Sequence, residues 1–257
     1  MHRSALWLSL FLLAPAAHAQ TAAPVRLILV GDSTMATRSG YGDALCARFR
    51  PEVACINLAR GGRSSGSFRA EVRWKEVQAL LSDGTPPGAT YVLVQFGHND
   101  QPGKPGRSTD LVHQFPANMA RYADEVRALG AVPVLVTPLT RRSFRGRWLH
   151  DDLAPWSAAV RRVARGAGVD LLDLNAMSIA AVQAMGTRQA DLLAQEPPPV
   201  VPAAAEAAAA GVEPQGAPKS KFDRTHLGAK GSALFSAMVA GELVRLRPEL
   251  AATLRQP

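Results

Sequence analysis

Short apolar runs alternate along the chain with segments in which hydrophobic residues recur at helical spacing. Runs of this length, bounded by Gly, Pro or polar residues, are typical of buried strands. They cover residues 25–30, 53–58, 91–96, 132–137 and 169–174. The helical pattern covers residues 41–49, 68–81, 114–129, 155–166 and 227–246, and Gly130 is placed to end the third of these helices.

Strand and helix therefore follow one another five times. This order predicts a parallel sheet covered by helices on both faces, in other words a three-layer α/β/α sandwich with a five-stranded parallel sheet. In such sheets ligands bind at the carboxyl ends of the strands, so the residues that follow each strand are the first candidates for chemistry.

Two segments differ from this pattern. Residues 1–19 combine a basic start, an apolar stretch and a small-x-small site at Ala17-His18-Ala19, which is the layout of a secretory signal peptide. The apolar stretch is shorter than the ~20 residues that a membrane-spanning helix needs. We therefore expect a periplasmic or secreted protein whose single domain covers residues 20–257, with no membrane attachment after cleavage.

The second segment, at about residues 195–218, is rich in Pro and Ala. Prolines at both ends interrupt regular structure, so we expect a surface loop inserted into the domain. No chemistry is evident in its sequence.

The net charge of +8 changes the list of expected partners. A basic secreted protein favours anionic partners such as nucleic acid, acidic lipid or acidic polysaccharide. No nucleic-acid-binding motif appears, which argues against nucleic acid. Cys46 and Cys55 either form a disulfide or remain buried thiols, and two cysteines alone make no zinc site. We expect no metal and no cofactor, and a monomer.

Four short motifs stand at the predicted strand ends or near the C-terminus. Each has an ordinary interpretation when taken alone, as a helix cap, a loop or an Asx turn. Together they supply a serine hydroxyl, a histidine base, a carboxylate that orients it and donors for an oxyanion, which is a complete acyl-transfer site. The motifs are Gly31-Asp32-Ser33, Gly61-Gly62, Gly97-His98-Asn99-Asp100 and Asp223-Arg224-Thr225-His226.

These motifs, in this order and spacing, resemble the four blocks of the SGNH (GDSL-like) hydrolases, which have a flavodoxin-like fold. Longer strings, including residues 95–100, 137–144 and 221–227, resemble the rhamnogalacturonan acetylesterase-like branch of carbohydrate esterases. The resemblance implies Ser33 as nucleophile, with Asp223 and His226 as its proton relay. It also implies an oxyanion hole made by the Ser33 and Gly62 N–H groups and the Asn99 side chain, and no metal.

A second serine motif competes with this assignment. Gly62-Arg63-Ser64-Ser65-Gly66 fits the G-x-S-x-G pattern of α/β-hydrolases. That pattern requires a strand running directly into the serine, whereas residues 58–61 separate Ser64 from the preceding strand. We therefore favour Ser33 over Ser64.

The substrate is less sharply defined. The resemblance implies O-acetyl groups on plant cell-wall polysaccharide, chiefly rhamnogalacturonan or another anionic pectin. Asp32 and His98 are candidates for lining the pocket, although a structural hydrogen bond explains His98 equally well. Arg141 and Arg142 belong to a basic cluster that extends to Arg147, and this cluster either contacts galacturonate carboxylates or forms a solvated loop.

Three alternatives remain open. The first is an esterase that acts on acetylated xylan or short oligosaccharides. The second is a periplasmic lipase or thioesterase of the same fold, which would need a long apolar groove for its acyl chain. The third, a carbohydrate-binding protein without activity, is disfavoured by the intact Ser33, Asp223 and His226 set.

Overall fold

A five-stranded parallel sheet forms the centre of the computed structural model, which describes residues 24–83, 88–196 and 222–256. The strand order is β2-β1-β3-β4-β7, and every neighbouring pair is parallel. The strands are β1 (Arg26–Gly31), β2 (Ala54–Asn57), β3 (Thr90–Gln95), β4 (Val132–Val136) and β7 (Asp170–Leu172). All five strands predicted from the sequence are present.

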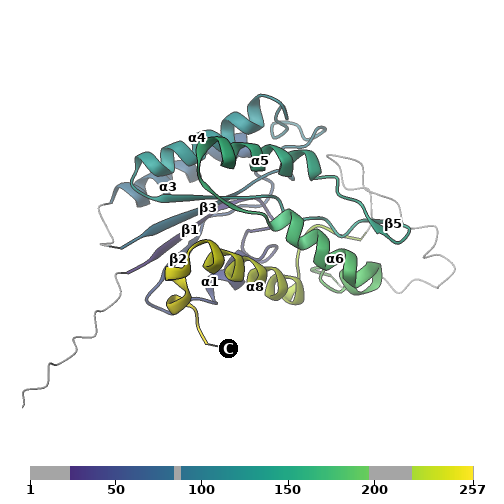
Figure 1. Ribbon diagram of the computed structural model, residues 1–257. Coiled ribbons are helices and arrows are strands. Elements are labelled where there is room, and N and C mark those ends of the chain that lie inside the picture. Colours follow the sequence, from purple (N-terminus) through teal and green to yellow (C-terminus); the bar gives the residue numbers. More distant parts are fainter. Residues whose placement is uncertain (1–23, 84–87, 197–221, 257) are drawn as a thin grey trace, which may run out of the picture.

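Helices cover both faces of the sheet (Figure 1). One layer contains α2 (Ser65–Ala70), α3 (Val72–Ser82), α4 (Gln114–Ala128) and α5 (Ala154–Ala167). The other contains α1 (Gly42–Cys46), α6 (Leu174–Asp191) and α8 (Ala229–Leu246), followed by the short helix η1 (Pro248–Thr253). The predicted three-layer α/β/α fold is confirmed.

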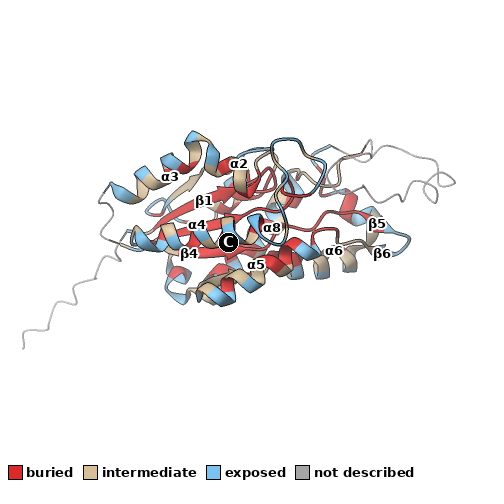
Figure 2. Ribbon diagram, turned by 90° about the horizontal axis from the view of Figure 1, so that it is seen from above, coloured by how far each residue is buried: buried red, intermediate tan, exposed pale blue. Residues whose placement is uncertain are grey.

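The period-two alternation of the strands explains why the core has two halves. Leu27 and Leu29 of β1 pack under α1, α6 and α8, whereas Ile28 and Val30 pack under α2 to α5. Both faces of the central strands are therefore apolar, as a sheet covered on both sides requires. Figure 2 shows the buried residues concentrated on the strands and on the inner sides of the helices.

Three local features differ from the sequence prediction. The helix expected over residues 68–81 is two helices, α2 and α3, because Glu71 between them is extended (φ −95°, ψ 169°). Helix α6 was not predicted, since its many Ala and Met residues form no single apolar stripe. The hairpin of β5 (Phe144–Arg145) and β6 (Trp148–Leu149) was also not predicted, and strands of two residues leave little pattern to detect.

A disulfide joins Cys46, the last residue of α1, to Cys55 in β2. The two Cα atoms lie 5.3 Å apart, within the range that a disulfide spans. The structure thus selects the disulfide over two free thiols.

Two of the sequence predictions concern residues that the structure does not describe. The predicted signal peptide, residues 1–19, lies entirely outside the described residues, and the predicted insertion at about 195–218 lies almost entirely outside them. Among the helices in the described part of the chain, none combines the length and apolarity needed to cross a membrane.

Candidate active site

The register of the sheet brings two of the candidate motifs together. β1 and β3 are neighbours, and Gly31 at the end of β1 pairs with Gln95 at the end of β3. The segments that carry Ser33 and Asn99 therefore leave the same edge of the sheet side by side. This edge is the place where parallel sheets hold their ligands.

Ser33 lies in a tight turn directly after β1. The carbonyl of Asp32 accepts hydrogen bonds from the N–H groups of Met35 and Ala36, and the carbonyl of Ser33 accepts one from the Ser39 hydroxyl at 2.8 Å. Ser33 itself is 9% exposed. The serine is thus fixed by its backbone at the boundary between core and surface.

The Gly61-Gly62 loop passes close to this serine. A Cβ atom placed on Gly61 would lie 3.8 Å from the Cβ of Ser33, and the N–H of Arg60 donates to the carbonyl of Gly31 at 2.9 Å. Gly62 has a φ of +76°, in the left-handed region that glycine adopts at little cost. The backbone conformation at Gly62 is therefore favoured by the absence of a side chain.

Asn99 has its amide oriented from both ends. Its Nδ2 donates to the carbonyl of Arg63 at 3.0 Å, and its Oδ1 accepts from Nζ of Lys104 at 3.3 Å. An amide nitrogen carries two hydrogens, so one donor of Asn99 is left after the bond to Arg63. The sequence did not indicate that Lys104 or Arg63 contacts Asn99, because only the fold brings them together.

Asp100 ends the motif at residues 97–100, but the sequence assigned it no role. Its carboxylate accepts from the Ser65 hydroxyl at 2.5 Å, from the Ser65 N–H at 3.0 Å and from the Thr109 hydroxyl at 2.9 Å. Burial raises the pKa of Asp100 to about 7. This residue ties the loop after β3 to the start of α2, and so ties the Asn99 loop to the Gly62 loop.

Asp223 and His226 form a hydrogen-bonded pair in the loop before α8. Nδ1 of His226 lies 2.6 Å from Oδ2 of Asp223, while Oδ1 accepts from the N–H groups of Thr225 and His226. Burial alone would raise the pKa of Asp223, but its hydrogen bonds and the charge of His226 outweigh this and lower it. The side chains are 39% and 34% exposed, so the pair is open to solvent.

Ser39 connects this loop to the serine turn. Its hydroxyl donates to the carbonyl of Ser33, and its own carbonyl accepts from the N–H of Leu227 at 2.9 Å. Leu227 directly follows His226 in the chain. Two hydrogen bonds through one residue therefore place the Asp223–His226 pair beside the Ser33 turn, although some 190 residues separate them in sequence.

Arg142 also holds this loop, which corrects the sequence prediction for it. Arg142 is fully buried, and its guanidinium donates to the carbonyls of Asp223, Thr225 and His226 at 3.0, 3.3 and 2.8 Å. The backbone N–H of Arg142 also donates to the carbonyl of Arg224 at 3.0 Å. Arg142 is therefore neither a substrate contact nor part of a solvated loop.

The other arginines of the predicted basic cluster differ from one another in burial. Arg141 is buried, forms an ion pair with Asp152 and donates to the Thr225 hydroxyl at 3.2 Å. Arg145 and Arg147 are exposed in the β5–β6 hairpin, where the guanidinium of Arg147 lies 4.8 Å from the ring centre of Trp148. The four arginines thus do not form one surface.

Asp32 and His98 form a second Asp–His pair, and this one is buried. Nδ1 of His98 lies 3.2 Å from Oδ2 of Asp32, while Oδ1 of Asp32 accepts from the N–H and hydroxyl of Thr34. Gln95 extends the network, since it donates to the Thr34 hydroxyl and accepts from the Tyr41 hydroxyl. The expectation that Asp32 lines the pocket is corrected, and for His98 the structure agrees with the alternative of a structural hydrogen bond: both residues lie beneath the site and link its strands.

Burial affects the two groups of this pair in different ways. It lowers the pKa of His98, because the charged imidazolium is costly away from water. It would raise the pKa of Asp32, but the charge and hydrogen bond of His98 and the bonds from Thr34 outweigh it, so the pKa of Asp32 is lowered. Asp32 thus keeps its charge in a fully buried position.

Ser64, the competing serine, has a structural role. It is the N-cap of α2, where it forms a capping box with Ser67, and it is fully buried. Its hydroxyl accepts from the Ser67 N–H at 3.2 Å. The position at the start of α2, with no strand running into it, agrees with the preference for Ser33.

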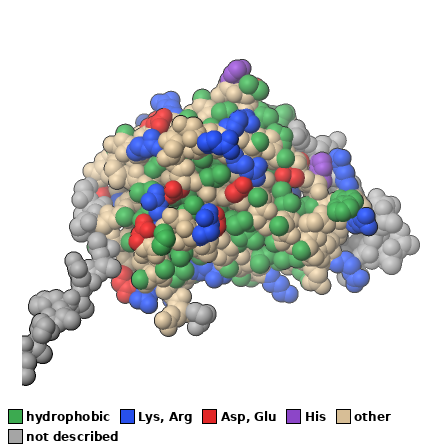
Figure 3. All heavy atoms as spheres, in the orientation of Figure 1, with side chains coloured by type: hydrophobic (Ala, Val, Ile, Leu, Met, Phe, Trp, Pro, Cys, Tyr) green, Lys and Arg blue, Asp and Glu red, His purple; other side chains and the backbone are tan. Residues whose placement is uncertain are grey.

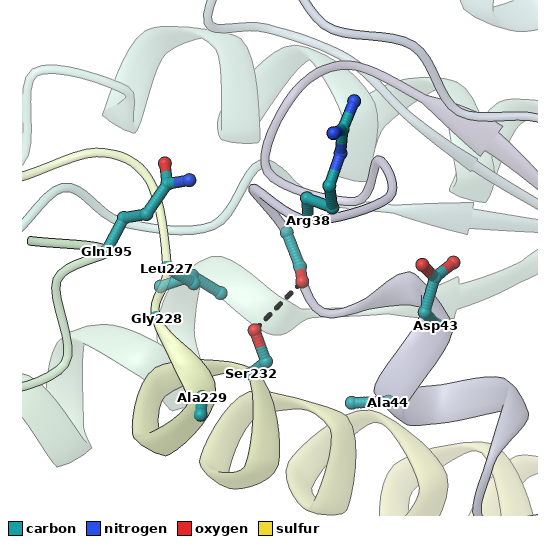
Figure 4. A pocket seen from close by; sticks show the side chains of 9 residues that line it. Arg38, Asp43, Ala44, Gln195, Leu227, Gly228, Ala229 and Ser232 are labelled. Atoms are coloured by element: carbon teal, nitrogen blue, oxygen red, sulfur yellow. Dashed lines mark hydrogen bonds between the residues drawn. The ribbon is translucent and has the colours of Figure 1, made fainter.

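A shallow hollow of about 420 Å³ is lined by residues that include Leu227 and Gly228, which follow His226 in the chain. Figure 4 shows it between α1 and the start of α8, with Leu227 and Gly228 on its wall and the Ser232 hydroxyl bonded to the carbonyl of Gly40. None of the candidate catalytic side chains lines it. This hollow is therefore separate from the serine site.

On the face of the molecule that Figure 3 shows, the charged side chains are spread rather than gathered. Figure 3 shows Lys and Arg side chains distributed over the visible face among acidic and apolar ones. Within the described ranges, no three His, Cys, Asp or Glu side chains converge in a way that would hold a metal ion.

Known proteins resemble this chain in sequence and in fold. Residues 29–234 match the GDSL-like lipase/acylhydrolase family. Rhamnogalacturonan acetylesterase RhgT of Bacillus subtilis is 34% identical over 179 residues, covering 66% of this chain and 73% of RhgT. The probable rhamnogalacturonan acetylesterase YesY of the same organism is 32% identical over 161 residues, covering 60% of this chain and 72% of YesY.

Solved structures share the fold at lower identity. Protein YXIM_BACsu of Bacillus subtilis has a TM-score of 0.65 and 20% identity, covering 88% of this chain, which spans 58% of that protein. Axe2, an acetyl-xylooligosaccharide esterase from Geobacillus stearothermophilus, has a TM-score of 0.59 and 16% identity, covering 87% of this chain and 96% of Axe2. The chain belongs to the GDSL-like lipase/acylhydrolase family, in its rhamnogalacturonan acetylesterase-like branch, and is a carboxylic ester hydrolase.

Proposed function

We propose that this protein is a serine esterase that removes O-acetyl groups from plant cell-wall polysaccharide, with rhamnogalacturonan as its main substrate. The observation that carries the proposal is the solvent-accessible Asp223–His226 pair, which Ser39 ties to the Ser33 turn. A serine, a histidine and a carboxylate at one site are the components of nucleophilic acyl transfer.

The reaction proceeds in two steps. His226 takes the proton of the Ser33 hydroxyl as the oxygen attacks the acetyl carbonyl, and Asp223 holds the imidazole at 2.6 Å in the required tautomer. The sugar hydroxyl then leaves with the proton from His226, and an acetyl-serine remains. Water that gives its proton to His226 attacks the acetyl-serine and releases acetate.

The tetrahedral oxyanion is stabilised by the N–H groups of Ser33 and Gly62 and by the Asn99 amide. The left-handed backbone at Gly62 and the two hydrogen bonds that orient Asn99 support this role. Removing one such donor costs on the order of 10²–10³ in turnover. An Asn99→Ala enzyme with unchanged kcat would contradict the assignment.

The substrate class is supported by two relatives, at 34% and 32% identity, that bear the name rhamnogalacturonan acetylesterase or probable rhamnogalacturonan acetylesterase. The signal-like residues 1–19 support action outside the cytoplasm.

The test compares Ser33→Ala with Ser64→Ala. We expect para-nitrophenyl acetate turnover to disappear in Ser33→Ala and to persist in a folded Ser64→Ala protein; the reverse result would refute the assignment. Acetate release from acetylated rhamnogalacturonan, acetylated xylan and a long-chain ester then identifies the substrate. If the protein cleaves acetylated xylan or the long-chain ester faster, that compound would replace rhamnogalacturonan as the proposed main substrate.

A further inference from the structure

Two cationic side chains lie beside the residues proposed for the oxyanion hole. Nζ of Lys104 donates to Oδ1 of Asn99 at 3.3 Å. On the other side, a Cβ placed on Gly62 would lie 3.4 Å from Nη1 of Arg107. Both cations come from the turn at residues 101–109, between β3 and α4.

Neither cation is neutralised within the described part of the chain. No ion pair joins Lys104 or Arg107 to an acidic group there. The acids that act on Lys104 from nearby are Asp32 and Asp152, and these already bind His98 and Arg141 respectively. Burial and the charges of Arg141 and Arg107 lower the pKa of Lys104, as expected where positive charge is in excess.

The turn that carries the two cations is well fixed. The carbonyl of Lys104 accepts from the N–H groups of Arg107 and Ser108, and the Ser108 hydroxyl donates to the carbonyl of Gln101. At its far end, Thr109 is bound to Asp100 through both its N–H and its hydroxyl. Because the backbone is already ordered, little of the binding free energy is lost in arranging the turn.

The two side chains also retain unused donors. An ammonium group has three donors, and Asn99 occupies one of those of Lys104. A guanidinium offers a fork of donors that matches a carboxylate. Arg141 and Arg142, the arginines that the sequence indicated for this task, have their guanidinium groups engaged by Asp152 and by the His226 loop.

We propose that Lys104 and Arg107 bind a uronate carboxylate of the acetylated chain next to the reacting ester, and so select acidic over neutral polysaccharide. The proposal rests on the proposed esterase function and deepens it, because it assigns substrate selection to two specific residues. A carboxylate held there would meet two cations that form no ion pair among the described residues, and the charge-assisted hydrogen bonds that result are stronger than those between neutral groups.

The test uses acetylated rhamnogalacturonan in two forms, with free carboxylates and with the carboxylates methyl-esterified. Both forms present the same acetyl groups, so the ratio of their kcat/KM values isolates the carboxylate. We expect this ratio to be about 10 or more in the wild-type protein. It should fall several-fold in Lys104→Gln and in Arg107→Gln, and fall in the wild-type protein as salt is added.

Arg162→Gln is the matched control, because it removes the same charge from an exposed position on α5. Its ratio should equal that of the wild-type protein. The measurement is a ratio because Lys104 contacts Asn99, so its loss is expected to slow turnover of both substrates.

Two failures can be told apart. If the wild-type protein releases acetate but the ratio is the same in the wild-type, Lys104→Gln and Arg107→Gln proteins, the selection proposal is wrong while the esterase function stands. If it releases no acetate from any ester, the proposed function is wrong.

Calorimetry of oligogalacturonate binding to the Ser33→Ala protein tests the selection in either case. The binding must weaken when Gln replaces Lys104 or Arg107 in this protein. Unchanged binding overturns the proposal.

Discussion

The molecule contains two Asp–His pairs at the same edge of its sheet, and they differ mainly in their exposure to solvent. The Asp223–His226 pair has a 2.6 Å contact and side chains 34–39% exposed. The Asp32–His98 pair has a 3.2 Å contact and side chains at most 3% exposed. Both have a histidine Nδ1 facing a carboxylate, so the residue types alone do not separate a proton relay from a structural link.

The surroundings of the two pairs explain the difference. Asp32 and His98 lie in a hydrogen-bond network with Thr34, Gln95 and Tyr41 that joins β1 to β3, and no part of it is open to a substrate. A proton carrier must exchange protons with substrate and water during each reaction cycle. The accessible pair is suited to this task, whereas the buried pair stabilises the base of the site.

The largest expected difference is in catalysis. His226→Ala should lower kcat by about 10⁴ or more, because it removes the proposed general base. His98→Asn, which keeps a polar group in the buried network, should retain most of the activity. Ester hydrolysis by the two purified proteins checks this, and thermal unfolding confirms that each is folded. Equal losses in two folded proteins would remove the distinction between the pairs.

A second prediction concerns how the accessible pair is held. Arg142→Ala removes three bonds to the carbonyls of the Asp223–His226 loop. We expect kcat to fall by about 10- to 100-fold with little change in KM, because a small displacement of the base impairs proton transfer more than binding. Arg142→Lys should recover part of the loss. A folded Arg142→Ala protein with unchanged kcat would show that the loop holds its position without the guanidinium.

For stability we expect the buried Asp32–His98 pair to matter more than the accessible Asp223–His226 pair, the reverse of their order in catalysis. Asp32→Asn is expected to cost about 2–4 kcal/mol of unfolding free energy, because it disrupts a buried, hydrogen-bonded pair. Asp223→Asn should cost less than about 1 kcal/mol, since its side chain is partly solvated, while it strongly lowers kcat. Urea unfolding of both variants measures the difference. A larger stability loss for Asp223→Asn would contradict the comparison.

The smallest effect is on titration. Burial lowers the pKa of His98, so its imidazole should titrate below the ordinary value of 6.5. The sign follows from the cost of placing the charged ring away from water. An NMR titration of the histidine ring resonances, assigned with the His98→Asn protein, measures the midpoint. A midpoint above 6.5 would mean that attraction to Asp32 exceeds the effect of burial.

Much of the fold was predictable because its signals are local. The five apolar runs are each long enough to mark a buried strand, and the helices with one apolar stripe were found close to their observed bounds. Helix α6 escaped detection because its apolar residues are not confined to one face. The break at Glu71 was also missed, since the hydrophobic spacing continues across it.

The sequence by itself determined the fold class and the candidate motifs, because strand periodicity and short motifs depend on neighbouring residues. It could not show that Asp32 and His98 form a second, buried pair, since these two residues stand 66 positions apart in the chain. It assigned the basic cluster to the surface, whereas Arg142 is buried in contact with a loop some 80 residues away. Only the tertiary structure decided these points, because burial and long-range hydrogen bonds are properties of the packed chain.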